Sequence, residues 1–145
     1  MVSYRKMQDS DYNGVMQLIH EFYEDYLEEF GSSINIDVLT KTFDKLKDSS
    51  FIVEEDHKVV GLLGGRIVTD ELSDEKTYAE VMWFMSKYHR KYGLKLLYFV
   101  EDWVRAQGMK RMMMVHLCNE EGEKLLDFYT RLGYTPMEMH YIKQL

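Results

Sequence analysis

Apolar side chains recur every three or four positions in four stretches of the chain, and this spacing predicts four amphipathic helices. The stretches are residues 11–30, 35–48, 91–107 and 120–132. Gly108 and Gly133 directly follow the last two stretches, where a glycine commonly ends a helix. We therefore expect four helices, two of them near the N-terminus and two in the second half of the chain.

The other apolar segments have the shorter period of strands. Residues 50–55 and 58–68, joined by an Asp-His pair, predict a β-hairpin, and the mostly apolar residues 76–86 predict a buried central strand. The remaining expected strands are residues 2–7, 110–117 and, as one strand or a pair of short ones, 134–145. The predicted order of elements is β-α-α-β-β-β-α-β-α-β.

Length and composition predict one domain over residues 1–145. The chain has 145 residues, 46% of them hydrophobic, which is enough for one well-filled core and too little for two ordinary domains. A formal net charge of -7 argues against a general binder of the nucleic-acid backbone, so nucleic acid is not an expected partner. No apolar run approaches the roughly 18 residues of a membrane span, and no signal peptide is visible, so we expect a cytoplasmic protein.

Metal-binding patterns are missing from the sequence. Cys118 is the single cysteine, and the five histidines form no pair at the i, i+4 spacing of a helical metal site. We expect no metal site.

Positive charge gathers in "HRKYGLKLL", residues 89–97, although the chain as a whole is acidic. Arg90, Lys91 and Gly93 stand directly before the predicted third helix. The first turn of a helix has backbone N–H groups without helical partners and carries the positive end of the helix dipole, so it suits a phosphate. Gly93 would let the backbone approach such a ligand closely. The stretch thus predicts a site for a phosphorylated molecule, unless it is an ordinary solvated helix start.

Two motifs in this order of elements resemble the GNAT superfamily of acyl-CoA-dependent N-acyltransferases. The family carries Arg/Gln-x-x-Gly-x-Gly/Ala at the junction of central strand and helix; Arg90 and Gly93 match it, and Lys95 replaces the small third residue. The segment "LLDFYTRLGYTPMEM" is similar to the family's "FYxxxGF" segment and places Tyr129 at the tyrosine. The resemblance covers essentially the whole chain.

The resemblance implies the fold and the cosubstrate. The expected fold is α+β (α/β mixed) and GNAT-like, with a mixed, mostly antiparallel sheet of six to seven strands flanked by about four helices. The expected cosubstrate is acetyl-CoA, its pyrophosphate at the start of the third helix and its thioester carbonyl at a backbone N–H of the central strand near Phe84 or Met85. The implied binding residues at the helix start are Arg90, Lys91, Tyr92, Gly93, Leu94, Lys95 and Leu96. The long side chain of Lys95 must point away or contact the ligand itself.

Acyl transfer needs a base for the acceptor ammonium and a proton for the leaving thiolate. The resemblance implies that Glu80, on the central strand, stands where family members often have a general base. It also implies that Tyr129 stands where a tyrosine of the family commonly acts as general acid. Glu80 has an alternative interpretation as a carboxylate on the exposed face or the edge of the sheet. Tyr129 has an alternative interpretation as a core aromatic.

The function expected from the resemblance is transfer of acetyl to a primary amine by direct attack in a ternary complex. The five carboxylates of "EFYEDYLEEF" would attract an amine if they wall the acceptor site, but such a run of charge is usually the solvated face of an amphipathic helix. The alternative to an enzyme is an inactive GNAT-fold binding module that acts through a protein partner, which Lys95 favours. Pairing through residues 137–145 would give a homodimer, and a monomer is equally compatible.

Overall fold

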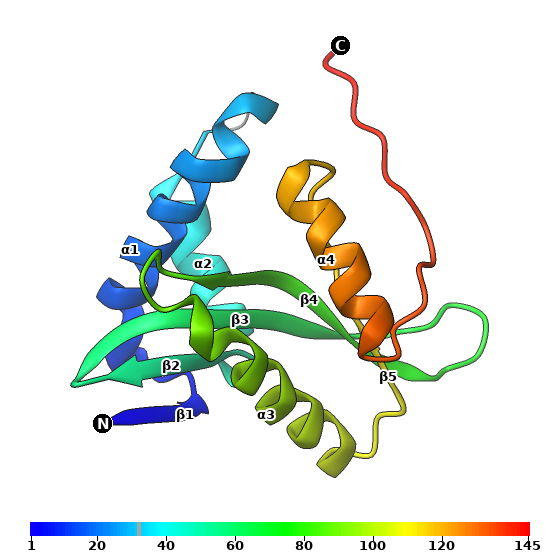
Figure 1. The fold of residues 1–145 in the computed structure, drawn as a ribbon, viewed down its shortest axis with the longest axis horizontal. Helices are drawn as coiled ribbons and strands as arrows, with labels where there is room; N and C mark the ends of the chain where they lie inside the picture. The colour runs from blue at the N-terminus through cyan, green and yellow to red at the C-terminus, as the bar shows by residue number, and fades with distance from the viewer. Residues whose placement is uncertain (32) are drawn as a thin grey trace. The chain divides into compact units, whose positions relative to one another are not determined.

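The computed structural model of the chain describes residues 1–31 and 33–145 (Figure 1). Within these residues it has one five-stranded sheet and four α-helices. The strands are β1 (Val2–Lys6), β2 (Phe51–Glu55), β3 (Lys58–Thr69), β4 (Lys76–Met85) and β5 (Arg111–Met113). The α-helices are α1 (Tyr12–Phe22), α2 (Ile36–Leu46), α3 (Gly93–Ala106) and α4 (Glu120–Arg131). The contacts form two compact units, Met1–Met114 and Val115–Leu145.

The sheet of the first unit is mixed and has the order β1-β2-β3-β4-β5. The first three pairings are antiparallel, and β4 and β5 run parallel. β4 pairs with β3 along its whole length, from Thr69↔Lys76 to Gly61↔Met85. Its pairing with β5, by contrast, covers only Thr77 to Ala79 among the described residues. Within the part of the chain that the structure describes, no strand continues along β4 beyond Ala79 on the β5 side, and we call this stretch the open edge of β4.

Helices cover both faces of this sheet (Figure 1). On one face, α1 and α2 pack against β2, β3 and β4 around a core that includes Val15, Phe43, Leu62 and Phe84. On the other face, α3 places Trp103 against Phe51 and Tyr78, with ring centroids 5.0 and 6.1 Å apart. The buried character of β4 that the sequence predicted follows from this double cover.

A β-bulge in β4 changes which face its residues point to. Gly64 pairs with Met82 and Gly65 pairs with Glu80, so Val81 is an extra residue in β4. Cross-strand partners point to the same face. A Cβ on Gly65 would lie 2.4 Å from Cζ of Tyr78, so glycine is needed there to admit the buried Tyr78 ring on the α3 face.

The second unit is organised by α4. Asn119 caps the helix by accepting a hydrogen bond from the N–H of Gly122, 2.8 Å away. A Cβ on Gly122 would lie 1.8 Å from the carbonyl oxygen of Leu117, so the cap requires glycine. Gly133 has φ of 91° and ends the helix, as its position in the sequence predicted.

The prediction of four helices and of the central hairpin is confirmed, with small differences at the ends. The third helix begins at Gly93, not near Lys91, and a short 3-10 turn, Arg90–Tyr92, precedes it. The first predicted helix continues beyond α1 as a π-helical turn, Tyr23–Leu27, and a 3-10 turn, Glu28–Phe30. Short 3-10 turns also occur at Asp9–Asp11 and Lys47–Ser49.

The prediction of six to seven strands is wrong, since the described residues form five. None of residues 134–145 is in a strand, and the strand expected over 110–117 shortens to β5. A strand exists through its hydrogen-bonded partner, and an alternating sequence specifies the conformation without supplying that partner. The apolar side chains of the final segment are exposed: Met137, Met139, Tyr141, Ile142 and Leu145.

A partly buried ionic cluster ties β1 to the start of α1. The guanidinium of Arg5 donates to both carboxylate oxygens of Asp11, at 2.8 and 2.9 Å, and to Glu54 on β2 at 2.5 Å. Asp11 also accepts a hydrogen bond from the backbone N–H of Gln8 at 2.8 Å. The hydrogen bond with Asp11 raises the pKa of Arg5 further above its usual value.

We predict that Asp11→Ala lowers the free energy of unfolding by about 3 kcal/mol, because it leaves a partly buried guanidinium without its main partner. Urea denaturation followed by circular dichroism measures the change. Asp56→Asn is the control: Asp56 pairs with the N-terminus but is 79% exposed, and asparagine tolerates its positive φ of 49°, so the free energy of unfolding should change little. Equal losses in the two variants would contradict the role given to Asp11.

Candidate active site

The β4–α3 loop, residues 86–92, connects the open edge of β4 to the start of α3 and is fixed at both ends. The N–H of Ser86 donates to the carbonyl of Val60 at 2.9 Å, which continues the ladder with β3. The N–H of His89 then donates to Ser86, and that of Tyr92 to His89, at 2.9 and 3.1 Å. The loop is thus a series of tight turns that leads directly into the helix.

Strand geometry assigns the backbone groups of Phe84 and Met85 to opposite sides of β4. In an antiparallel pair, residues alternate between positions bonded to the partner strand and positions directed away from it. Because Ser86 bonds to Val60 on the β3 side, Phe84 is also directed toward β3 and Met85 toward the open edge. Of the two predicted donors for the thioester carbonyl, the backbone N–H of Met85 is the one that points where β5 does not extend.

The cations of the predicted site lie at the surface of the loop. Arg90 donates from Nη2 to the hydroxyl of Tyr26 at 3.1 Å, and its guanidinium carbon lies 5.8 Å from the centre of the Phe84 ring. The ammonium of Lys91 lies 5.1 Å from the centre of the Tyr92 ring. Both side chains are exposed, so they can reach a phosphate near the loop.

Gly93 has a packing role that the sequence did not reveal. A Cβ at this position would lie 3.3 Å from Cγ of Met85 and 3.5 Å from the Trp83 ring, so glycine lets the first turn of α3 approach β4 closely. Leu96 is completely buried, so only its backbone is available to a ligand, whereas Leu94 is exposed. The glycine of the motif therefore brings the helix start and the open strand edge together.

Lys95 points away from the β4 edge. Its ammonium lies 5.2 Å from the centre of the Tyr4 ring on β1, and β1 is separated from β4 by two strands. Of the two alternatives that the sequence left open, the structure shows the first, with the side chain directed away. The lysine at the small-residue position does not fill the open edge.

Glu80 lies on the α3 face of the sheet and is 9% exposed. This follows from its pairing with Gly65 and from the bulge at Val81, since cross-strand partners share a face. The alternative interpretation of Glu80 as a carboxylate on an exposed face of the sheet is therefore wrong, and its role as general base stays a prediction. Burial, and secondarily the charge of Glu80, raise the pKa of the neighbouring Tyr78 phenol, whose hydroxyl donates to the carbonyl of Ser49 at 2.6 Å.

Tyr129 is a buried residue of the second unit, 6% exposed. Its hydroxyl lies 3.5 Å from the carbonyl oxygen of Val115, a long hydrogen bond, and its ring stacks on His116 with centroids 6.4 Å apart. It also contacts Tyr134 edge to face. Tyr129 is therefore a core aromatic of its unit, and its part in catalysis stays a prediction.

The acidic segment after α1 is amphipathic. Phe22 and Tyr26 pack against Phe84, with ring centroids 5.4 and 6.3 Å apart. The exposed carboxylates are Glu24, Asp25, Glu28 and Glu29. Glu21 has a separate role, because it accepts a hydrogen bond from the backbone N–H of Lys87 at 3.3 Å. The segment thus has the solvated face that its sequence allowed, and it also supports the β4–α3 loop.

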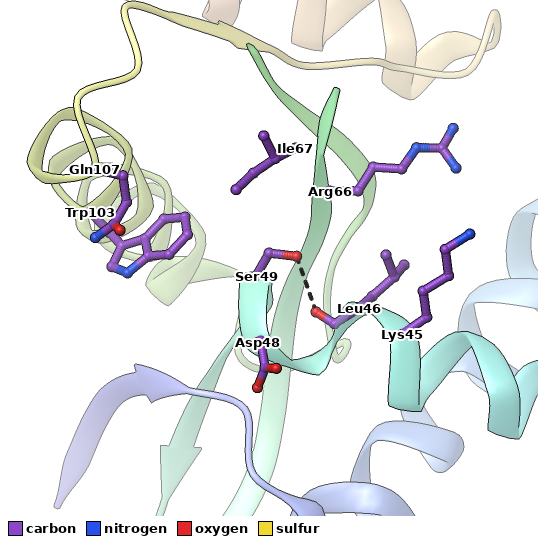
Figure 2. Close-up of a pocket in the computed structure, with 8 residues that line it drawn as sticks. All are labelled: Lys45, Leu46, Asp48, Ser49, Arg66, Ile67, Trp103 and Gln107. Atoms are coloured by element: carbon purple, nitrogen blue, oxygen red, sulfur yellow. Dashed lines mark hydrogen bonds between the residues drawn. The ribbon is translucent and has the colours of Figure 1, made fainter. Parts of the chain in front are cut away.

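An open cavity of about 520 Å³ lies at the other end of α3 (Figure 2). Its lining consists of Lys45, Leu46, Asp48, Ser49, Arg66, Ile67, Trp103 and Gln107. None of these is a predicted site residue, and Trp103 and Gln107 belong to the C-terminal part of α3, whereas the predicted cofactor residues stand at its start. The part of the chain that the structure describes contains no group of three His, Cys, Asp or Glu residues suited to a metal, and no helix long and apolar enough to cross a membrane.

Comparison with known protein families identifies the chain. The model of the acetyltransferase (GNAT) family matches residues 17–134. The chain belongs to the GNAT acetyltransferase family. It is an acyl-CoA-dependent N-acetyltransferase by this membership, and the family uses acetyl-CoA.

Solved structures share the fold at low sequence identity. The chain is similar to the aminoglycoside acetyltransferase meta-AAC0020 from an uncultured soil metagenomic sample, at 17% identity and a TM-score of 0.77, over 99% of this chain and 96% of that one. AAC(6')-Iy, solved with the bisubstrate analogue CoA-S-monomethyl-acetylneamine, has 16% identity and a TM-score of 0.75, over 100% and 99% of the two chains.

Glucosamine-6-phosphate N-acetyltransferase from Arabidopsis thaliana is similar as well, at 16% identity and a TM-score of 0.72, over 99% and 98% of the two chains. A comparison with curated protein sequences finds no match. These structures share the GNAT fold with the chain, and their identities are too low to transfer a substrate.

Sequence reasoning missed the side chains that hold the loop. Glu55, the last residue of β2, accepts a hydrogen bond from the Tyr92 hydroxyl at 2.6 Å, and its other oxygen lies 3.0 Å from Nε2 of His89. Glu55 is 37 residues from Tyr92 in the sequence, so no local pattern indicated the contact. Tyr92 was predicted to contact the cofactor, but its hydroxyl is directed to β2.

We predict that Tyr92 titrates well above an ordinary tyrosine. The hydrogen bond to Glu55, together with desolvation and the charge of Glu55, raises the pKa of Tyr92 to about 12 from 10.0. Because the folded-state pKa is raised, the stabilising contribution is complete below pH 10 and is lost as the pH rises toward 12. NMR of 13Cζ-labelled tyrosine measures the titration, and Tyr92→Phe assigns the signal. In Glu55→Ala the pKa should fall toward 10; an unchanged value would contradict the assigned cause.

Proposed function

We propose that the chain transfers an acetyl group from acetyl-CoA to a primary amine by direct attack in a ternary complex. The observation that carries the proposal is the open edge of β4, which directs the backbone N–H of Met85 outward just before the β4–α3 loop and the start of α3. A strand edge beyond the reach of the neighbouring strand suits an extended amide-containing chain, and a helix start with cations suits phosphate. These two features, in this order along the chain, match the two ends of coenzyme A.

The binding residues proposed are those of the β4 edge and the loop. The backbone N–H of Met85 would donate to the thioester carbonyl, and Arg90 and Lys91 would face the pyrophosphate from their exposed positions. The helix start, Gly93 to Leu96, would contribute its backbone and the positive end of its dipole. Lys95 takes no part, since its side chain lies over Tyr4.

The proposed reaction moves three protons and exchanges a C–S bond for a C–N bond. The acceptor gives up its ammonium proton to Glu80, directly or through water, and the amine nitrogen attacks the thioester carbon. The C–N bond forms, the C–S bond breaks, and the leaving thiolate takes a proton from the Tyr129 hydroxyl. The amide nitrogen then loses its second proton, which returns the Tyr129 phenolate to the phenol directly or through water. Burial of Glu80 on the strand that carries the open edge supports its role. The role of Tyr129 rests on the motif, and the match of the family model across both units supports treating residues 1–145 as one domain.

The acceptor proposed is a cationic amine, with amino sugars as the first class to screen. The exposed carboxylates Glu24, Asp25, Glu28 and Glu29 favour a cation near the loop that their segment supports. Aminoglycoside and glucosamine-6-phosphate acetyltransferases are among the structures that share the fold. The alternative of an inactive binding module depended on Lys95, and the direction of that side chain leaves it without support. A cytoplasmic location and a homodimer stay predictions.

We predict that acetyl-CoA stabilises the protein and that Arg90→Ala weakens its binding about tenfold or more, because a charged partner of the phosphates is lost. At about 100 times its dissociation constant, acetyl-CoA should add roughly 2.7 kcal/mol to the stability of the wild type. Thermal unfolding and calorimetric titration measure both effects. Arg105→Ala is the matched control, since Arg105 is exposed and pairs with Asp102 at 3.0 Å near the C-terminal end of α3. No thermal shift with millimolar acetyl-CoA would refute the proposed cosubstrate site.

We predict that Tyr129→Phe lowers kcat at least tenfold, because the leaving thiolate loses its proton donor, while the dissociation constant for acetyl-CoA stays within about twofold. Steady-state assays of thiol release with a cationic amine, across a range of pH, measure the effect. Tyr134→Phe is the control, since Tyr134 contacts the Tyr129 ring from the same unit. Full turnover of Tyr129→Phe at every pH would remove the acid assignment.

A further inference from the structure

Two side chains of the β4–α3 loop converge on one carboxylate of the neighbouring hairpin, and a third joins them through His89. The Tyr92 hydroxyl donates to Oε1 of Glu55 at 2.6 Å, and Nε2 of His89 lies 3.0 Å from Oε2. The other ring nitrogen of His89, Nδ1, is 2.6 Å from the hydroxyl of Ser86. The chain of contacts Ser86–His89–Glu55–Tyr92, which we name the Glu55 network, therefore spans the loop from its first residue to its last.

The geometry of this network suits a role in holding the β4–α3 loop in one conformation. Each oxygen of the Glu55 carboxylate has its own partner, and the His89 and Tyr92 rings stack at 27° with centroids 6.3 Å apart. The side chains of His89 and Glu55 are only 24% and 28% exposed, so water screens their interaction less than it screens a surface pair. Two rings held by one carboxylate leave the loop little freedom to change its path.

The network acts where an anionic ligand would meet the loop. Ser86 continues the β4 ladder and Tyr92 directly precedes Gly93, so the Glu55 network fixes the path of every residue between the open edge and α3. A ligand that orders a mobile loop on binding loses affinity through the entropy of that ordering. A loop fixed in advance avoids this loss. The hydrogen bonds to Glu55 also compensate a negative charge close to the proposed phosphates.

We propose that Glu55 and His89 are positioning residues for coenzyme A: they touch no reacting atom, and they set cosubstrate affinity by holding the β4–α3 loop in its binding conformation. This inference rests on the proposed function, because it concerns the same cosubstrate. Tyr92 belongs to the Glu55 network through its hydroxyl, so its side chain holds the loop and does not contact the ligand. The hairpin end that carries Glu55 thereby becomes part of the binding site without lining it.

The experiment is calorimetric titration of the full chain with acetyl-CoA, at a temperature where every variant is folded by circular dichroism. We expect Glu55→Gln and His89→Ala to raise the dissociation constant about tenfold, and Tyr92→Phe to raise it about fivefold, because it removes a single oxygen. His89→Gln retains a donor near the Nε2 position and should bind more tightly than His89→Ala. The matched control is His57→Ala, in the turn of the same hairpin, where the side chain is fully exposed and the constant should not change.

The outcomes separate this inference from the proposed function. If the wild type and the four variants bind acetyl-CoA within about twofold of one another, Glu55 and His89 have no positioning role. The same conclusion follows if the variants lose thermal stability while their dissociation constants stay unchanged, since the network would then be structural alone. If His89→Ala fails to fold, Glu55→Gln and Tyr92→Phe decide the question. If the wild type itself binds no acetyl-CoA, the proposed function fails, and this inference fails with it.

Discussion

The unequal pairing of β4 determines the rest of the candidate site. One side of the strand is bonded to β3 along its whole length, which fixes its position, and the other side is bonded to β5 over three residues. A buried strand normally has its backbone groups satisfied on both sides, because unpaired polar groups are costly away from water. A strand that is rigid on one side and open on the other offers backbone hydrogen bonds to a ligand at a defined position.

The β4–α3 loop shows how an acidic chain presents a cationic surface. Carboxylates hold the loop from both faces of the sheet: Glu21 at the end of α1 bonds the backbone of Lys87, and Glu55 at the end of β2 bonds Tyr92 and His89. Arg90 remains at the surface, beside the hydroxyl of Tyr26 and the face of Phe84. The two carboxylates that hold the loop are thus engaged in structure, while Arg90 and Lys91 face solvent.

The sequence predicted what depends on local patterns and missed what depends on distant contacts. The helices and the hairpin are confirmed, because apolar spacing and glycine caps are local signals. The prediction of a strand over 134–145 is wrong, because a strand needs a hydrogen-bonded partner, and the alternation of apolar and polar residues does not specify one. The direction of the Lys95 side chain was ambiguous from the motif alone, since it depends on Tyr4, 91 positions earlier in the chain. Glu55 had no signal at all, and its role became visible only when the hairpin and the loop were placed together.

The bulge in β4 changes how the alternation of side chains in this strand relates to the two faces of the sheet. Glu80 and Phe84 are four positions apart, an even number that in a regular strand puts both on one face, yet they lie on opposite faces because Val81 is an extra residue. The strand therefore carries two phases, one on each side of Val81. A relative that lacks this residue would have Glu80 directly before Met82, as Gly64 directly precedes Gly65 on β3, so the side chains from Lys76 to Glu80 would keep their faces. A one-residue gap here therefore removes the bulge and leaves the core unchanged.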